Sequence, residues 1–493
     1  MNKLLNRPII KNTLYILITN FLIRFLGLFN RIIITRILGI EGMSLYVLIT
    51  PTIFLFLTIS TLSINISTTK IISESIETKK LSPYKVLISG SKLLLKSQII
   101  TIIIFLLSFR FISVNLLKNQ DLLLPLLFSI PTYFITGYTD LLKGYYNGLK
   151  KMKYSCNATL IEQITRIISS IILILLFKKY GVIVAVSVCV LSDAVGEAIS
   201  LLYLLFYIKK DIIKYDNTSG EEKEIIKMSI PQTLNRLVNS ITMFLEPIIY
   251  TNLLLSLYNK ETITNYYTSF TAYALPLISI FMFIPQAVNS AALPHMSEIF
   301  IKQKDTKSRE FLSKVILFSI IPGIISTIIL YNYAPFLMNL LYKTTIGVDI
   351  IRQIVIFYFL FYLHLPLINA LTALGKTKLN FITSTFCSFL KLILILLFIN
   401  KGLSSIIYAS IIVLILHTLI NYLQVNKLIK IKFKPIIIIK LILITIITIC
   451  LNIILNYFNT NDFISIITIV ITYLILLLFL KEESSGINKS SLA

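Results

Sequence analysis

The feature that most constrains this chain is a long succession of apolar segments, each about as long as a membrane is thick. The chain has 493 residues, of which 56% are hydrophobic and only 14% are charged. Soluble proteins carry about 25% charged residues, so this composition cannot cover a water-exposed surface. Crossing a hydrocarbon core of about 30 Å takes about 20 helical residues. The sequence therefore predicts an all-α protein that crosses the membrane many times.

We predict fourteen transmembrane helices from the positions of these apolar segments. They lie near 11–37, 44–68, 86–112, 122–145, 156–178, 182–208, 226–254, 263–290, 311–332, 350–373, 379–400, 403–425, 436–457 and 463–480. The loops between them are short, none longer than about 20 residues, so no separate water-soluble domain is expected.

The basic residues predict how the chain is oriented. There are 46 Lys and Arg residues against 22 Asp and Glu, for a net charge of +24. Alternating the loops across fourteen spans puts 29 of these bases, Lys143 among them, on the side of both tails, and 8 on the opposite side. Cytoplasmic loops carry an excess of Lys and Arg. We therefore expect both termini in the cytoplasm, and most of the positive charge reflects orientation instead of nucleic-acid binding.

The helices are expected to form two lobes. We predict an N-terminal lobe of six helices over 1–208, a cytoplasmic linker over 209–225, a C-terminal lobe of six helices over 226–425, and a C-terminal helix pair with its tail over 426–493. A duplicated unit of six helices re-enters the membrane in the same direction, which gives a parallel pseudo-repeat. Ser73-Glu74 at the end of the second helix recurs as Ser297-Glu298 at the end of the eighth.

The first helix carries two positive charges inside the predicted span. Asn20, Arg24, Gly27 and Arg31 are spaced i, i+4, i+7 and i+11, which puts them on one helical face. A charge at mid-bilayer costs about 2.5–3.5 kcal/mol on insertion scales, so it must face protein or water. The two arginines either pair with carboxylates of neighbouring helices or form a cationic wall of a substrate cavity, the interpretation we favour.

The seventh helix carries a comparable polar strip. It consists of Gln232, Asn235, Asn239, Thr242 and Glu246, with Arg236 to one side. Amides at such positions either bind sugar hydroxyls or join helices by hydrogen bonds. Arg236 either contacts a phosphate or extends to the headgroups. We keep Asn235, Arg236 and Asn239 as candidate substrate-binding residues.

Further charges fall in the fifth and sixth helices. Glu162 and Arg166 are an i, i+4 pair in the favourable order, which suggests a structural ion pair. Asp193 and Glu197 lie one turn apart on one face. They either bind a cation or share a proton, or they pair with Arg24 or Arg166.

A single lysine, Lys391, lies near the middle of the eleventh helix. Glu246 is its plausible acidic partner in the second half of the chain, so we predict a Glu246–Lys391 bridge that either holds two helices together or breaks during transport. The 4 cysteines and 3 histidines form no ligand motif. No metal site and no cofactor are therefore expected.

Three stretches of the chain resemble a known family of exporters. They are Arg24–Gly27 (RFLG) followed by Leu38–Tyr46 (LGIEGMSLY), Gly144–Gly148 (GYYNG) followed by Ile161–Arg166 (IEQITR), and Leu293–Glu298 (LPHMSE). On these motifs and the fourteen-helix layout, the chain resembles the multidrug/oligosaccharidyl-lipid/polysaccharide exporter superfamily. Within it, the chain is most similar to the spore-cortex flippases of the stage V sporulation protein B group, which are related to lipid II flippases.

This resemblance implies a fold, a function and a site. It implies two lobes around a central cavity lined by the first, second, seventh and eighth helices, which opens alternately to each side of the membrane. The expected function is a flippase for an undecaprenyl-diphosphate-linked oligosaccharide, such as lipid II or a spore-cortex peptidoglycan precursor. Related flippases use cavity arginines against the diphosphate, and Arg24 and Arg31 lie at matching positions.

The expected partners and location follow from the same reading. They are the lipid-linked substrate, the bilayer and a coupling ion, proton or sodium, for which Asp193, Glu197 and Glu246 are candidates. We expect a monomer in the bacterial cytoplasmic membrane, with no nucleic-acid partner and no enzymatic activity.

Two other functions are less consistent with the sequence. A cation-coupled multidrug exporter of the same superfamily should have an acidic cavity, whereas the first helix here is basic. A membrane-embedded glycosyl- or acyltransferase should have a membrane histidine or a large outer loop with paired carboxylates. The predicted outer loops are short, and their acidic residues are isolated.

Overall fold

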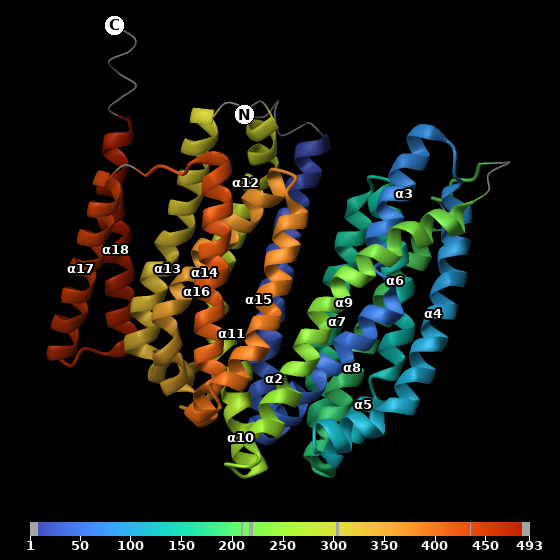
Figure 1. Ribbon diagram of the computed structural model, residues 1–493, viewed down its shortest axis with the longest axis horizontal. Coiled ribbons are helices and arrows are strands. Elements are labelled where there is room, and N and C mark those ends of the chain that lie inside the picture. Colours follow the sequence, from blue (N-terminus) through green and yellow to red (C-terminus); the bar gives the residue numbers. More distant parts are fainter. Residues whose placement is uncertain (1–7, 209–210, 216–219, 302–304, 434, 486–493) are drawn as a thin grey trace, which may run out of the picture. The chain divides into compact units, whose positions relative to one another are not determined.

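A computed structural model describes residues 8–208, 211–215, 220–301, 305–433 and 435–485 (Figure 1). The described residues are helical with short connections, which confirms the predicted fold class. The long helices are α2 (Pro8–Thr61), α3 (Ile64–Thr78), α4 (Pro83–Phe111), α6 (Ile130–Gly148), α7 (Met152–Phe177), α8 (Val182–Ile208), α9 (Glu221–Leu254), α12 (Phe283–Ile301), α13 (Asp305–Tyr342), α14 (Val348–Ala373), α15 (Thr377–Leu397), α16 (Ser405–Ile429), α17 (Pro435–Tyr457) and α18 (Asp462–Ser485).

Twelve helical stretches in the described residues are long and apolar enough to cross a membrane. The first, Ile18–Thr78, has 61 residues and is therefore about 90 Å long at 1.5 Å per residue, enough for two crossings. It bends at Gly39, whose φ of 67° lies in the left-handed region that glycine adopts without steric cost. With this helix counted twice and the shorter apolar helix Asp462–Leu478 added, the spans match the fourteen predicted segments.

Two predicted spans are interrupted instead of continuous. The span predicted at 122–145 consists of η2 (Gln120–Leu122), α5 (Leu123–Leu127) and α6. The span at 263–290 consists of α10 (Lys260–Thr268), η4 (Ser269–Ala274), α11 (Leu275–Ser279), η5 (Ile280–Met282) and the start of α12. Prolines lie in the first turns of α6 and α11, where the missing proline N–H breaks the preceding helical hydrogen bonds.

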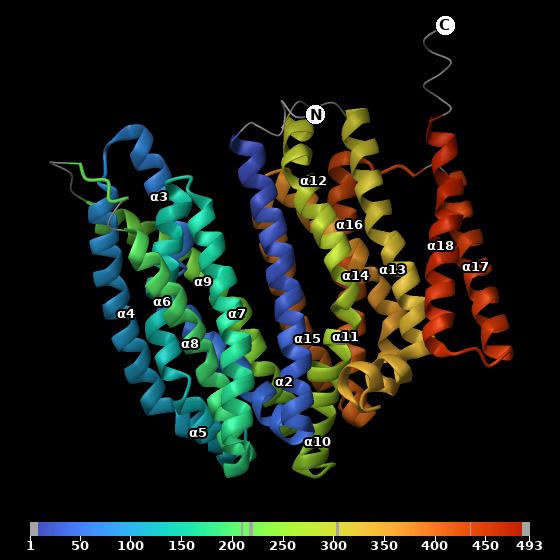
Figure 2. The ribbon, with the colours of Figure 1, turned by 180° about the vertical axis from the view of Figure 1, so that it is seen from behind.

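The described residues form two compact units. The first comprises Met1–Tyr273 with Ser388–Ala409, and the second Ala274–Cys387 with Ser410–Ala493. Each unit therefore takes part of α15 and α16. Figure 2, which turns the ribbon by 180°, shows that the helices within each unit run alongside one another. The predicted lobe boundaries at 208, 226 and 425 remain a prediction.

The first unit is held together by close helix packing between α3 and α6. A Cβ atom added at Gly144 would lie 2.6 Å from the carbonyl oxygen of Asn65, and one at Gly148 would lie 2.7 Å from Cβ of Ile72. Glycines four residues apart let two membrane helices approach until their backbones touch. Around this contact, α3, α4 and α6 bury a common core that includes Ile72 and Tyr145.

The second unit has its own core, built from α12, α13, α14 and α16 around residues such as Met296 and Leu367. The C-terminal helices attach to it through polar anchors. The Tyr333 hydroxyl of α13 donates to Asn452 Oδ1 of α17 at 2.7 Å, and the Tyr473 hydroxyl of α18 donates to the carbonyl oxygen of Ile321 at 3.0 Å. In an apolar environment such hydrogen bonds fix the register of helices whose surfaces are otherwise uniform.

Candidate substrate site

The cationic strip predicted on the first helix lies along α2 in the first unit. One face of this helix packs against α7, where Asn30 Oδ1 accepts a hydrogen bond from Ser170 Oγ at 3.1 Å. A Cβ atom added at Gly27 would lie 3.6 Å from Gln163 Nε2 of α7. Asn20 and Arg24 are exposed beside this contact. Gly27 is thus a packing position, whereas Asn20 and Arg24 remain accessible.

Arg31 differs from Arg24 in its surroundings. Its side chain is half-buried, and its guanidinium carbon lies 5.4 Å from the centre of the Tyr46 ring, which follows the bend at Gly39. A cation over an aromatic face is stabilised by about 0.5–2 kcal/mol. The bend in α2 therefore positions Arg31 against the second half of the same helix.

A cavity of about 310 Å³ opens beside Asn20, between α2, α3, α6 and α7. None of its nine lining residues is charged. Its polar wall comprises Thr19, Asn20, Thr69, Asn147, Ser155 and Thr159. The first unit therefore combines an exposed arginine with a neutral, hydrogen-bonding cavity on the same helix.

A buried ion network lies deeper in the first unit. Lys143 Nζ of α6 lies 2.6 Å from Glu162 Oε2 of α7, and both side chains are 9% exposed. Nη2 of the Arg166 guanidinium pairs with the second oxygen of Glu162, Oε1. The other terminal nitrogen of Arg166, Nη1, lies 3.6 Å from Asp193 Oδ1 of α8. The predicted Glu162–Arg166 pair thus forms, and Asp193 pairs with Arg166, one of the alternatives left open.

Lys143 corrects the sequence prediction. It was counted among the cytoplasmic loop bases, but α6 continues to Gly148 and Lys143 is buried in its last two turns. Without Lys143, the number of bases assigned to the cytoplasmic loops is smaller by one. Its place inside the predicted segment 122–145, three residues after Asp140, was the signal that could have identified it.

Glycine also shapes this network. A Cβ atom added at Gly196 of α8 would lie 2.8 Å from the carbonyl oxygen of Glu162, so α8 approaches α7 closely enough for Asp193 to reach Arg166.

Two further carboxyls lie nearby. Asp140 Oδ1 accepts from Asn65 Nδ2 at 3.4 Å, and Glu197 Oε2 is buried with no hydrogen-bond partner among the described residues.

Helix α9 packs against the second half of α2 through residues beside its polar strip. Thr58 and Ser240 hydroxyl oxygens are 2.9 Å apart. Arg236 Nη1 lies 3.5 Å from Ser63 Oγ, at the interruption between α2 and α3, where Leu62 and Ser63 both have φ 49°. Arg236, Asn235 and Asn239 are exposed. No described contact joins them to Arg24 or Arg31.

The predicted Glu246–Lys391 bridge is present within the first unit. Lys391 Nζ of α15 lies 2.7 Å from Glu246 Oε2 of α9, with side chains 22% and 15% exposed. The ammonium also lies 6.0 Å from the centre of the Phe270 ring.

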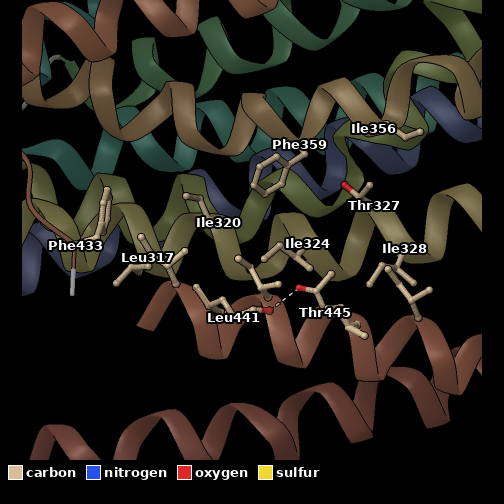
Figure 3. Close-up of a pocket in the computed structure, with 14 residues that line it drawn as sticks. Leu317, Ile320, Ile324, Thr327, Ile328, Ile356, Phe359, Phe433, Leu441 and Thr445 are labelled. Carbon is tan, nitrogen blue, oxygen red and sulfur yellow. Dashed lines mark hydrogen bonds between the residues drawn. The ribbon is translucent and has the colours of Figure 1, made fainter. Parts of the chain in front are cut away.

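The second unit contains an apolar groove of about 540 Å³ between α13, α14 and α17 (Figure 3). Its walls are aliphatic and aromatic side chains with two threonines, among them Ile324, Phe359 and Leu441. Figure 3 shows Phe359 and Ile324 pointing toward the helix that carries Leu441 and Thr445. Hydrocarbon is the ligand chemistry that such a surface fits.

The second unit also brings together two histidines that lie far apart in the sequence. The ring centres of His364 and His417 are 4.2 Å apart, and His417 Nε2 lies 3.5 Å from Ser384 Oγ. Over the residues that the structure describes, no three His, Cys, Asp or Glu side chains are close enough to hold a metal ion.

Comparison with known proteins supplies the family. Residues 9–300 match the family model described as polysaccharide biosynthesis protein. Stage V sporulation protein B of Bacillus subtilis (strain 168) is 27% identical over 446 residues, which cover 86% of this chain and 85% of that protein. Sporulation protein YkvU of the same organism is 25% identical over 386 residues, covering 75% and 83%.

Solved structures share the fold. The lipid II flippase MurJ in its inward closed conformation has a TM-score of 0.72 at 19% identity, covering 94% of this chain and 98% of that one. An inward-facing multidrug resistance MATE family transporter of the MOP superfamily has a TM-score of 0.62 at 13% identity, covering 82% and 94%. These two solved structures are a flippase and a transporter. Because the family model matches more than half of the chain, the chain belongs to the polysaccharide biosynthesis protein family.

Proposed function

We propose that the chain is a flippase for an undecaprenyl-diphosphate-linked oligosaccharide, such as lipid II or a spore-cortex peptidoglycan precursor. The observation that carries the proposal is an exposed arginine, Arg24, on the membrane helix that also lines an uncharged polar cavity. A diphosphate-sugar head group cannot cross hydrocarbon unaided, because burying its charge and hydroxyls without partners costs several kcal/mol per group. A cationic, hydrogen-bonding surface offsets that cost.

The arginines would bind the diphosphate. A guanidinium presents paired N–H donors to phosphate oxygens and stays charged at any physiological pH. Arg24 and Arg31 are about 10 Å apart along the helix at 1.5 Å per residue, so a diphosphate can pass from one to the other. Arg236, Asn235 and Asn239 of α9 are exposed in the same unit and would supply further donors.

The hydrocarbon tail needs a different surface. The bilayer supplies such a surface, because its hydrocarbon core holds a prenyl chain without desolvating polar groups. Because no bond is made or broken, the head group needs only to change sides while the tail stays in an apolar environment.

The ion pairs narrow the choice of coupling group. Asp193 is engaged by Arg166, and Glu246 by Lys391. Glu197 Oε2 has no partner among the described residues, so Glu197 can gain or lose a proton without breaking an ion pair. We assign proton coupling to Glu197, and a stabilising role to Glu162, Arg166 and Asp193.

The loop charges support a location. Their asymmetry favours a bacterial cytoplasmic membrane with both termini in the cytoplasm, and we propose that the chain acts there as a monomer.

One observation favours a second function, export of cationic drugs coupled to a cation. Four carboxyls, those of Asp140, Glu162, Asp193 and Glu197, lie in the first unit near two bases that form ion pairs with this group, Lys143 and Arg166. An acidic interior of this kind would attract a cationic substrate.

Rescue of a flippase-depleted bacterium, with outer-leaflet lipid II counted in the same cells, decides between the two functions. Rescue with restored lipid II supports the flippase. Drug resistance without rescue would support the exporter and overturn the flippase.

A further inference from the structure

The cavity beside Asn20 is built by two close helix contacts. Gly144 and Gly148 let α6 touch α3, which brings the Asn147 side chain next to Thr69. The contact of α2 with α7 around Gly27 brings Asn20 next to Ser155. Four helices thus fix the walls, so the cavity is a preformed feature of the first unit.

The hydrogen-bonding groups of the walls are distributed in a specific way. Thr69 Oγ1 donates to the carbonyl oxygen of Asn65 at 2.7 Å, and Thr159 Oγ1 donates to that of Ser155 at 3.0 Å. Both hydroxyl oxygens therefore keep lone pairs that can only accept. The carboxamides of Asn20 and Asn147 make no hydrogen bond within the described part of the chain, so each offers a donor and an acceptor.

The charge and the size of the cavity limit its occupant. No cation lines it, so it offers no charged partner to a phosphate or a carboxylate. A volume of about 310 Å³ lies at the lower end of the range of small-molecule sites. Arg24 follows Asn20 by one helical turn, about 6 Å along the axis. A phosphate held by Arg24 would therefore place the next group of the substrate at the mouth of the cavity.

We propose that this cavity binds the sugar ring attached to the diphosphate, and that it selects a neutral acetamido sugar. The acetamido group has one N–H donor and one carbonyl acceptor, which the carboxamides of Asn20 and Asn147 complement. The ring hydroxyls would donate to the lone pairs of Thr69 and Thr159. The inference rests on the proposed flippase function and names the part of the substrate that this part of the site recognises.

Cys156 lies in the cavity wall and provides a direct probe. In the full chain carrying C189A, C387A and C450A, reconstituted in lipid nanodiscs, N-ethylmaleimide can alkylate only Cys156. Three short-chain polyprenyl diphosphate lipids are compared, one bearing N-acetylglucosamine, one bearing glucose and one without a sugar. Binding of each lipid and the rate of Cys156 alkylation are measured together.

The expected result is that the N-acetylglucosamine lipid slows alkylation of Cys156 and the sugar-free lipid does not. The glucose lipid should bind about five-fold more weakly than the N-acetylglucosamine lipid, the effect of one lost hydrogen bond. Asn147→Leu and the isosteric Thr159→Val should each weaken binding of the N-acetylglucosamine lipid about five-fold. Neither substitution should change binding of the sugar-free lipid. Asn332→Leu, a matched substitution in α13 of the second unit, should not change the binding of either lipid.

The outcomes separate the inference from the proposed function. If the N-acetylglucosamine lipid and the sugar-free lipid both bind and neither protects Cys156, the sugar site is elsewhere and the flippase proposal stands. If no diphosphate lipid binds at all, the flippase proposal fails and this inference fails with it. Protection that survives unchanged in both Asn147→Leu and Thr159→Val would show that these side chains do not recognise the sugar.

Discussion

At the scale of single residues, the first unit is defined by buried charges that are paired. Lys143 and Glu162 are each 9% exposed and 2.6 Å apart. Burying two ions is expensive, and the attraction between them repays the cost only while both are present. Such a network contributes less to net stability than to specifying which helices meet, and it makes each member sensitive to loss of its partner.

Removing Glu162 should therefore be costly. Glu162→Gln leaves Lys143 without its carboxylate, and we expect a loss of about 3–5 kcal/mol in the free energy of unfolding, seen as a lower Tm in detergent. Lys143→Met should cost less, because Glu162 keeps its pairing with Arg166. Lys96→Met is the control, since Lys96 pairs with Glu222 at the surface with its side chain 69% exposed. Equal losses for Glu162→Gln and Lys96→Met would refute the role of the network.

The Glu246–Lys391 bridge gives a second test at this scale. Lys391→Met leaves Glu246 as an uncompensated charge in a membrane helix, whereas Lys391→Met with Glu246→Leu removes both charges. We expect transport and protein yield to fall further in the single variant than in the double. If single and double variants are equally damaged, the contact does not hold α9 and α15 together.

At the scale of helices, glycines decide how closely elements approach. Gly144, Gly148 and Gly196 each lie where a Cβ atom would come within 2.8 Å of a neighbouring helix. The α3–α6 contact brings Thr69 and Asn147 to the cavity, and the α7–α8 contact brings Asp193 to Arg166. Local packing thus determines the geometry of both polar regions of the first unit.

Alanine substitutions should distinguish glycines at close helix contacts from a glycine at an ordinary contact distance. Gly144→Ala would push its Cβ into the Asn65 backbone at 2.6 Å, and overpacking of this kind costs about 1–3 kcal/mol. Gly27→Ala would put a Cβ at an ordinary contact distance, 3.6 Å from Gln163 Nε2, and should leave stability nearly unchanged. Thermal unfolding of the two variants checks this prediction, and an equal drop in Tm would contradict it.

The helices themselves were predictable because their signal is local. Twenty apolar residues in a row can satisfy their backbone in a membrane only as a helix, so the fourteen segments, the Glu162–Arg166 pair and the Glu246–Lys391 bridge could be inferred from the sequence. The cavity and the pairing of His364 with His417 could not. They depend on how α3, α6, α14 and α16 pack, which the spacing of residues along one helix does not determine.

At the scale of the whole molecule, the chain belongs to the polysaccharide biosynthesis protein family and shares its fold with a lipid II flippase and with multidrug transporters. The fold alone does not distinguish a lipid from a drug, because the same scaffold serves both. We propose that the basic strip of α2 and the neutral cavity next to it select a diphosphate-linked sugar, so that a few side chains of α2 would determine the substrate.

Removing the Arg24 charge should therefore abolish transport while the fold remains intact. Arg24 is exposed, so Arg24→Ala should change Tm little. Arg110→Ala, which removes an exposed arginine from the end of α4, is the matched control. We expect normal protein levels for both variants, and rescue of a flippase-depleted bacterium only by Arg110→Ala.

The most direct test of the proposed function is the number of lipid II molecules in the outer leaflet of such cells, counted for the unaltered chain and for both variants at equal protein levels. The flippase proposal predicts that the unaltered chain and Arg110→Ala restore outer-leaflet lipid II, and that Arg24→Ala leaves it at the depleted level. Full restoration by Arg24→Ala, or none by the unaltered chain, would contradict it.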